Sequence, residues 1–171
     1  MTLDSELRAV VREAYRRCCG YCGVCEHNVG GMLEIDHFRP LRHSGTNALD
    51  NLVYACTTCN RFKGDYWPAP DVPESLSLLH PGRDKSTHLL ETVEGRLAGL
   101  TPRGWFHIER LHLNRPQLIA LRQARQMERL LQSETARAQD INIQLRKRIR
   151  ELEAELIELR NTIASLSTNP R

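Results

Sequence analysis

The chain has 171 residues, of which 40% are hydrophobic, 26% are charged and only 5% are aromatic. This composition is ordinary for a globular protein, but so few aromatic residues leave a small core that needs an additional cross-link. The net charge of +3 is modest, and no apolar run approaches the length of a membrane span, which argues against a membrane protein. The first residues also lack the hydrophobic region of a signal peptide, so we expect a cytoplasmic protein.

Three segments follow one another along the chain. Residues 1–68 contain every cysteine, residues 69–114 follow a proline-rich break, and residues 115–171 form a charged tail. Basic and acidic residues balance at eight each in the first segment, whereas the tail has eleven basic against seven acidic residues. The cysteine-rich segment is therefore not a cationic surface that would bind DNA strongly by charge alone.

The first segment predicts a helix, a hairpin and a second helix. Residues 5–17 place apolar side chains at helical spacing, with Ser5 as a cap. Residues 32–40 and 51–55 are rich in β-branched and aromatic residues and flank a polar loop, so we expect two short strands. Residues 56–64 predict a short helix that ends at a glycine.

The second segment predicts a smaller unit that supports the first. Residues 88–101 suggest a hairpin that turns at Glu94-Gly95, and a short helix is expected around Trp105–Leu111. The segment carries no catalytic constellation. Its four histidines are scattered, and we expect surface or packing positions rather than metal ligands for His80, His88, His107 and His112.

The tail predicts one long helix that begins at Pro116, because no further proline or glycine occurs before Pro170. Apolar side chains recur in it at alternating spacings of four and three residues, which is the seam of a coiled coil. The heptads are clearest over 142–166, with weaker layers at Leu121 and Leu131. The seam consists of Ile149, Leu156 and Ile163 at the a positions and Leu145, Leu152, Leu159 and Leu166 at the d positions.

The charges that flank this seam favour a coiled coil of two parallel helices. In that register Arg148 faces Glu153 of the partner helix, and Glu155 faces Arg160, while Asn142 would pair with its counterpart at an a position. The alternative is a helix that packs on its own domain, but its length of about 75 Å is too great for a small core to cover. We therefore expect a parallel homodimer or a coiled-coil partner protein.

The six cysteines form two close groups, Cys18, Cys19, Cys22 and Cys25, then Cys56 and Cys59. In a reducing compartment this pattern favours a metal over disulfides. Four thiolates from two Cys-x-x-Cys knuckles close a tetrahedral zinc site, which is structural because no position remains for water. Such a site supplies folding free energy that a small core lacks.

The first knuckle has two possible registers, because Cys19-Gly-Tyr-Cys22 and Cys22-Gly-Val-Cys25 have the same spacing. We prefer Cys19 with Cys22, since Gly23 follows directly and allows the tight turn. The predicted ligands are then Cys19, Cys22, Cys56 and Cys59, and Cys18 and Cys25 are spare thiols.

Four motifs follow one another from the first knuckle to the second: CxxCG at Cys19, IDHxxP at Ile35, DNL at Asp50 and CxxCNxxK at Cys56. This order resembles the HNH endonuclease family from Cys19 to Lys63, with weaker similarity through 111–116. The resemblance implies an α+β fold: a small ββα-metal finger stapled by the four-cysteine zinc site. A hairpin-and-helix extension and the long coiled-coil helix would follow it.

The resemblance also implies the catalytic residues. His37 would be the general base, Asp36 and Asn60 would bind the catalytic ion, and Asn51 would hold the loop that orients His37. Oxygen ligands around an open site suit Mg²⁺ or Mn²⁺, and an imidazole is suited to activate water near neutral pH. Taken singly, these residues are ordinary strand-end, turn or cap residues, and His43 in the loop is expected to be a loop residue rather than a second base.

Phosphate contacts would come from Arg39, Arg61 and Lys63. Arginines of the tail are further candidates, although a solvated helix face explains them equally well. The sequence thus predicts a metal-dependent endonuclease that acts on double-stranded DNA, targeted or paired through its helix, as in a bacterial or phage defence or mobile-element system. The alternatives are a zinc-stapled nucleic-acid-binding module recruited to a larger complex, and a purely structural adaptor, which would leave Asp36 and Asn60 unexplained.

Overall fold

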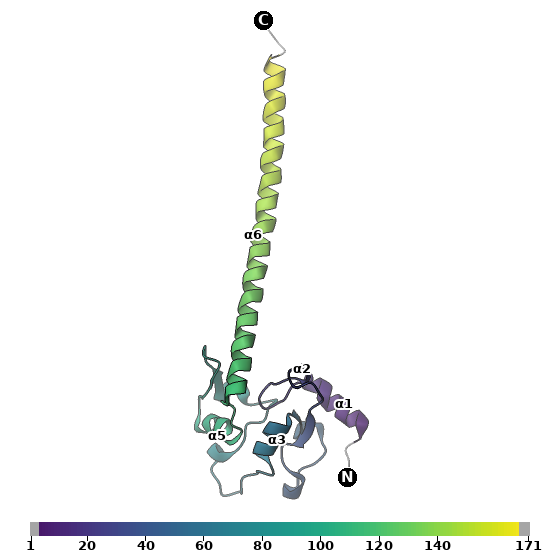
Figure 1. Ribbon diagram of the computed structural model, residues 1–171, viewed down its shortest axis with the longest axis vertical. Helices are drawn as coiled ribbons and strands as arrows, with labels where there is room; N and C mark the ends of the chain where they lie inside the picture. The colour runs from purple at the N-terminus through teal and green to yellow at the C-terminus, as the bar shows by residue number, and fades with distance from the viewer. Residues whose placement is uncertain (1–3, 168–171) are drawn as a thin grey trace. The chain divides into compact units, whose positions relative to one another are not determined.

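The computed structural model describes residues 4–167, and within them the fold is α+β, as predicted (Figure 1). The chain divides into two compact units, Met1–Arg125 and Gln126–Arg171. The helices are α1 (Ser5–Ala14), α2 (Glu26–Val29), α3 (Thr57–Lys63), α4 (Lys85–His88), α5 (Pro102–Arg110) and α6 (Pro116–Ser167). The strands are β1 (Glu34–His37), β2 (Leu52–Ala55), β3 (Leu89–Glu91) and β4 (Leu97–Gly99), and short 3₁₀ turns lie at Leu41–His43, Leu49–Asn51 and Glu74–Leu76.

The predicted hairpin and second helix form a ββα unit. Strands β1 and β2 pair antiparallel, with Asp36 opposite Val53, and every residue of β2 is buried. The loop between the strands closes tightly, because a Cβ atom at Gly45 would lie 1.8 Å from the carbonyl oxygen of Arg39. Helix α3 follows β2 directly and packs against β1. This arrangement places the start of β1 beside the first turn of α3 and the end of β1 beside Lys63 at the end of that helix.

Helix α1 is shorter than the sequence predicts. It ends at Ala14 rather than at residue 17, because Arg16 and Arg17 adopt left-handed backbone angles that turn the chain into the first knuckle. Its N-cap is Asp4 rather than Ser5. Partly buried hydrogen bonds tie the helix to the hairpin: Arg12 donates to Glu26 at 2.5 and 2.6 Å, and the Tyr54 hydroxyl donates to the same carboxylate at 2.5 Å.

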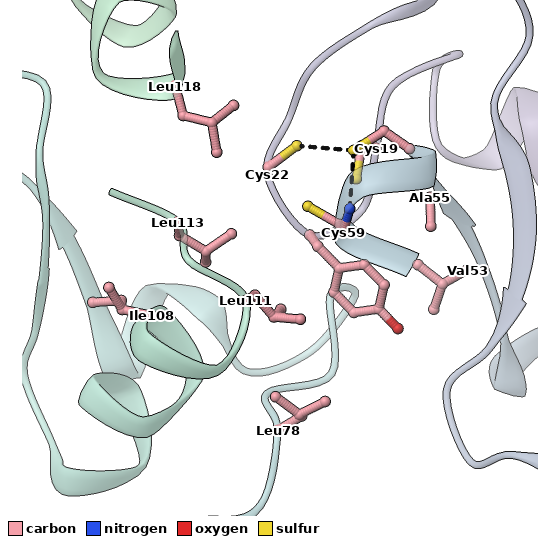
Figure 2. Packing of buried hydrophobic residues seen from close by; sticks show 12 residues of the cluster. Cys19, Cys22, Val53, Ala55, Cys59, Leu78, Ile108, Leu111, Leu113 and Leu118 are labelled. Atoms are coloured by element: carbon pink, nitrogen blue, oxygen red, sulfur yellow. Dashed lines mark hydrogen bonds between the residues drawn. The ribbon is translucent and has the colours of Figure 1, made fainter. Parts of the chain in front are cut away.

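The second hairpin and α5 complete the core of the first unit. Strands β3 and β4 pair antiparallel around the predicted turn, where Gly95 has a φ of 73°. Helix α5 begins at Pro102, earlier than predicted, because the Thr101 hydroxyl caps it by accepting from the Gly104 amide at 3.1 Å. Ile108 and other buried side chains of α5 and of the segment after it belong to the same hydrophobic cluster as the knuckle cysteines (Figure 2).

Helix α6 begins at Pro116, as predicted, and its first turns belong to the first unit, where Leu118 and Arg122 are buried. Within the second unit, the described seam side chains from Leu145 to Ile163 are all at least 42% exposed. The side chain of Leu166, the last predicted seam position, lies outside the described residues. Within the part of the chain that the structure describes, no helix has the length and apolar character required to cross a membrane.

Candidate functional site

The four predicted zinc ligands lie together in the core. The Sγ atoms of Cys19, Cys22, Cys56 and Cys59 all lie within 4.8 Å of one another. A tetrahedral zinc ion with Zn–S bonds of about 2.3 Å holds its sulfur ligands roughly 3.8 Å apart. The Sγ atoms of Cys22 and Cys56 are 3.7 Å apart, so the cluster has the dimensions of a zinc site (Figure 2).

Local backbone geometry produces each half of this cluster. In the first knuckle the Gly23 amide donates to the Cys19 carbonyl at 2.8 Å, and the φ of 79° at Gly23 suits glycine. In the second, Cys56 is the N-cap of α3, and its Sγ accepts from the Cys59 amide at 3.4 Å. The register with Cys19 and Cys22 is therefore the one adopted.

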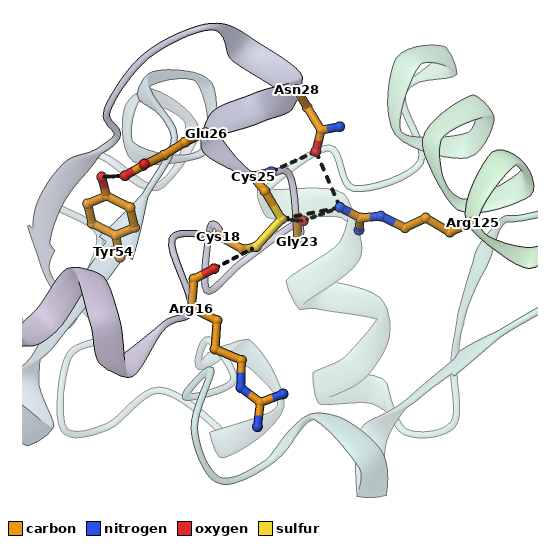
Figure 3. Close-up of a disulfide and its surroundings, with 8 residues drawn as sticks. All are labelled: Arg16, Cys18, Gly23, Cys25, Glu26, Asn28, Tyr54 and Arg125. Atoms are coloured by element: carbon orange, nitrogen blue, oxygen red, sulfur yellow. Dashed lines mark hydrogen bonds between the residues drawn. A yellow bond between two sulfur atoms is a disulfide. The ribbon is translucent and has the colours of Figure 1, made fainter. Parts of the chain in front are cut away.

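Cys18 and Cys25 are not spare thiols, and this prediction is corrected. The two residues form a disulfide (Figure 3). The tight turn of the knuckle brings its two ends together, since Cys18 and Cys25 also form an isolated β-bridge with Cα atoms 3.9 Å apart. Cys18 and Cys25 therefore cross-link the two ends of the knuckle turn, while the other four cysteines form the cluster.

The pKa values of the four thiols are shifted in different directions. A hydrogen bond with Cys22 is the main cause that lowers the pKa of Cys19 to about 7. Hydrogen bonds with Cys19 and Cys22 lower the pKa of Cys56, whereas hydrogen bonding to Cys19 raises the pKa values of Cys22 and Cys59. Four buried thiols therefore cannot all ionise without a cation, and a divalent ion would replace the remaining protons.

Three cationic side chains contact either the cluster or the backbone of its first knuckle. An Nη2 of Arg115 lies 3.7 Å from the Cys59 Sγ, and Lys85 donates to the Gly20 carbonyl and, at 3.0 Å, to the Tyr21 carbonyl. Arg125 donates to the Gly23 carbonyl at 2.9 Å (Figure 3). A four-thiolate zinc site carries a net charge of −2, so a cation as near to it as Arg115 is to Cys59 stabilises it.

A second feature is an open cleft of about 600 Å³ between β1 and α3. Five of the residues predicted for catalysis or phosphate binding line it: Asp36, His37, Asn60, Arg61 and Lys63. Two others, Asn51 and Arg39, lie outside its lining. The cleft also contains Glu34, which the sequence did not single out.

Asp36 is buried at the floor of the cleft, with 7% of its surface exposed. Its Oδ1 accepts from the Lys63 ammonium at 2.9 Å, and its Oδ2 accepts from the Tyr21 hydroxyl at 2.6 Å. Burial raises the pKa of Asp36, and the charge of Lys63 opposes that shift. Lys63 is itself buried and also donates to the His37 carbonyl at 2.7 Å, so a direct phosphate contact would require this ion pair to open.

His37 follows Asp36 at the end of β1 and is half-buried. Its Nε2 lies 2.8 Å from the Oδ1 of Asn47, in the loop between the strands. Because an amide oxygen only accepts hydrogen bonds, Nε2 carries the proton in the neutral ring. The lone pair of the imidazole is therefore on Nδ1.

Asn60 faces the same cleft from the middle of α3. Its Nδ2 donates to Oε2 of Glu34 at 2.6 Å, and Thr57 donates to Oε1 of the same carboxylate at 2.8 Å. This contact fixes which end of the amide points to Glu34. The amide oxygen, which is the atom that binds a metal ion, is not used in that bond.

Asn51 holds the loop between the strands together. Its Oδ1 accepts from the Arg39 amide at 2.8 Å, and its Nδ2 donates to the carbonyls of Arg39 at 3.0 Å and Thr46 at 2.8 Å. The Arg39 side chain donates to the His43 carbonyl at 2.5 Å, and its guanidinium lies 5.3 Å from the ring centre of Trp67. Arg39 therefore lies beside the cleft rather than in it.

Comparison with known families assigns this region. Residues 19–66 match the family model described as HNH endonuclease. The chain contains an HNH endonuclease domain. In the comparisons with curated proteins and with solved structures, nothing matches the chain.

The HNH match begins at the first ligand of the cysteine cluster and ends just after α3. It thus contains both knuckles, both strands of the first hairpin and α3. The second hairpin, α5 and α6 all lie beyond it.

Three polar residues of the HNH domain were missed by the sequence analysis. Glu34 had a signal, because it lies two residues before Asp36 and alternation along a strand places both on one face. Asn47 had none, since any polar residue of the loop could have reached His37. Tyr21 lies inside the first knuckle, and only the packing of that knuckle on β1 brings its hydroxyl to Asp36.

Proposed function

We propose that the HNH domain is a metal-dependent endonuclease that hydrolyses phosphodiester bonds in double-stranded DNA. One observation carries the proposal: a single cleft gathers a histidine of fixed tautomer, a buried carboxylate and an oriented amide. Membership of the HNH endonuclease family supports a nucleic-acid substrate.

His37 acts as the general base. While Nε2–H donates a hydrogen bond to Oδ1 of Asn47, the Nδ1 lone pair takes a proton from the attacking water. The hydroxide forms a bond to phosphorus as the bond to the leaving oxygen breaks. By analogy with the family, the products carry a 5′-phosphate and a 3′-hydroxyl.

Asp36 and Asn60 are the proposed ligands of the catalytic ion. Two of the four lone-pair sites of the Asp36 carboxylate are used by Tyr21 and Lys63, which leaves two for an ion. Oxygen donors of this kind suit Mg²⁺ or Mn²⁺. When bound, the ion stabilises the charge on the phosphoryl and leaving oxygens. Arg61 is exposed at the cleft and is free to approach a phosphate.

The test compares plasmid cleavage by the wild type, His37→Ala and His43→Ala, each with about one zinc per chain, in Mg²⁺ or Mn²⁺. We expect His37→Ala to slow cleavage by about 100- to 10,000-fold, the usual contribution of a general base. His43→Ala is the matched control, since His43 contacts Arg39 through its backbone carbonyl alone. Equal cleavage by the wild type and His37→Ala would refute the role of His37.

A second candidate function is nucleic-acid binding without hydrolysis. The observation that favours it is the closed ion pair of Asp36 and Lys63, which withholds part of the carboxylate from an ion. Zinc-loaded wild type that binds DNA but leaves the plasmid intact with both ions would support this candidate and exclude the first.

Helix α6 is proposed to pair with a second copy of the chain in parallel. Its described seam side chains are exposed, and exposed apolar seams of this length are covered by a partner helix. Arg148 lies 3.2 Å from Glu151 and 3.9 Å from Glu155 of its own helix, so its charge is on the flank of the seam where interhelical pairs form. Pairing would compensate for the weak charge of the nuclease domain by avidity. Such a nuclease suits a defence or mobile-element system that acts with a partner protein.

A further inference from the structure

A cavity of about 200 Å³ lies beside the catalytic cleft and has no part in the proposed hydrolysis. Its walls include the rings of Phe38, Tyr66 and Trp67, and Leu78 and Arg103 also line it. Drug-sized ligands need roughly 300–1,000 Å³, so this cavity is too small for them. Its size and its aromatic walls suit one flat ring system.

The cavity adjoins the cleft along two segments of the chain. Phe38 follows His37, and Tyr66 follows Asp65, so the Cα atoms of these two cavity residues are each about 3.8 Å from that of a residue that lines the cleft. The cavity and the cleft are therefore neighbours in the fold. Only Phe38 and Tyr66 among its aromatic residues fall inside the family match, and Trp67 lies just beyond it.

The aromatic walls are held rigidly. Phe38 meets Trp67 edge to face at 5.9 Å and His80 at 4.8 Å between ring centres. The Tyr66 hydroxyl donates to the Leu76 carbonyl, and the guanidinium of Arg110 lies 4.8 Å from the centre of its ring. Because these rings are already fixed, a ligand would lose little additional side-chain entropy on binding.

Arg103 adds a polar group to the cavity. Its terminal nitrogens donate to Glu74 at 3.0 Å and to the Leu78 carbonyl at 2.8 Å. The guanidinium thus places a positive charge at the wall of the cavity, where a hydrogen-bond acceptor at the edge of a ligand would be favourable.

We infer that this cavity binds a single nucleobase that has left its stack, next to the phosphodiester in the cleft. Aromatic side chains bind unstacked bases through their ring faces, and arginine supplies a donor to a base edge. The guanidinium of Arg39 over Trp67 adds a positive charge beside the cavity, which favours the approach of a nucleotide. The inference rests on the proposed nuclease function and narrows its substrate to DNA with an unpaired or extruded base.

Trp67 offers a direct probe, because the chain has only two tryptophans. Trp105→Phe leaves Trp67 as the single tryptophan, whose emission can be excited selectively, and alters a residue that is 50% exposed and lies outside the cavity. Adding His37→Ala and omitting Mg²⁺ prevents cleavage during the titration. The ligands are an oligothymidylate of about eight nucleotides, within the usual site sizes, and an abasic oligomer of the same length.

We expect saturable quenching of Trp67 by the oligothymidylate and none by the abasic oligomer. Followed by the anisotropy of a labelled oligonucleotide, Trp67→Ala should bind the oligothymidylate about tenfold more weakly, whereas Trp67→Phe should keep most of the affinity. Zinc content confirms that each variant is folded. Equal quenching by the abasic oligomer, no saturable quenching, or wild-type affinity in Trp67→Ala would overturn the inference.

Plasmid cleavage by the wild type separates this inference from the nuclease proposal. Cleavage without base-dependent quenching would refute the base site and support the nuclease proposal. Base-dependent quenching without cleavage would support a nucleobase-binding cavity and refute the nuclease proposal.

Discussion

Removal of the Asn47 side chain tests how the imidazole of His37 is held for catalysis. Asn47→Ala deletes one neutral hydrogen bond, of 2.8 Å, at an exposed position. Such bonds contribute about 0.5–1.5 kcal/mol, and about 1.4 kcal/mol corresponds to a tenfold change in rate. If the bond persists through the transition state, its loss should slow cleavage by roughly 2- to 13-fold, far less than the loss of His37 itself.

The assay is the initial rate of plasmid cleavage at saturating Mg²⁺, with zinc content measured for each variant. Asn47→Asp keeps an acceptor for the Nε2 proton, so it should cleave faster than Asn47→Ala. His43→Ala, in the same loop, should cleave like the wild type. The reasoning fails if Asn47→Ala is as slow as His37→Ala, or if it matches the wild type while Asn47→Asp is impaired.

Three further predictions concern stability and assembly. Cys56→Ser should lose zinc and unfold the first unit, because a structural zinc site contributes about 10–16 kcal/mol to folding. Cys18→Ser, which alters a cysteine outside the cluster, should keep about one zinc per chain. Metal analysis and circular dichroism would compare the two variants. Burial lowers the pKa of His107 from 6.5 to about 3, so unfolding takes up a proton and stability falls as the pH drops below 6.5. Urea titrations at about pH 7.5 and about pH 5.5 should show the wild type losing roughly 1.4 kcal/mol more than His107→Gln. Leu156→Lys should weaken pairing through α6 by about 3 kcal/mol or more, measured by sedimentation equilibrium, and Ile157→Lys beside the seam should not; monomeric wild type would contradict self-association.

The four-cysteine cluster could be predicted because knuckle spacing and a following glycine are local features. The register depended on the positive φ that Gly23 adopts, and this property belongs to the residue itself. The disulfide of Cys18 and Cys25 was missed for a different reason. Treating these cysteines as left over from the metal site ignored that a tight turn brings its two ends together.

The members of the catalytic cleft were predictable, but their contacts were not. Motif order placed His37 and Asn60 in one cleft, since a strand and the helix after its partner must meet in a ββα unit. The Asp36–Lys63 ion pair joins residues 27 positions apart, and its formation depends on how deeply α3 packs against β1. Lys63 was expected to contact phosphate, but in the structure its ammonium group is buried against the Asp36 carboxylate.

The four-cysteine cluster and the proposed catalytic cleft are linked through Asp36. Both groups that hold its carboxylate come from the segments that the four thiolates join: Tyr21 lies between Cys19 and Cys22, and Lys63 is on α3 after Cys59. Burial and the charge of Asp36 raise the pKa of Tyr21 well above its usual value, so its hydroxyl remains a donor.

Loss of zinc should therefore abolish cleavage by releasing Asp36, even though zinc takes no part in the reaction. Sensitivity to a chelator alone would not identify the catalytic ion. After chelation and dialysis, Mg²⁺ alone should fail to restore cleavage, whereas zinc followed by Mg²⁺ should restore it. Recovery with zinc alone would instead place zinc in the cleft and contradict the assignment of a separate catalytic ion to Asp36 and Asn60.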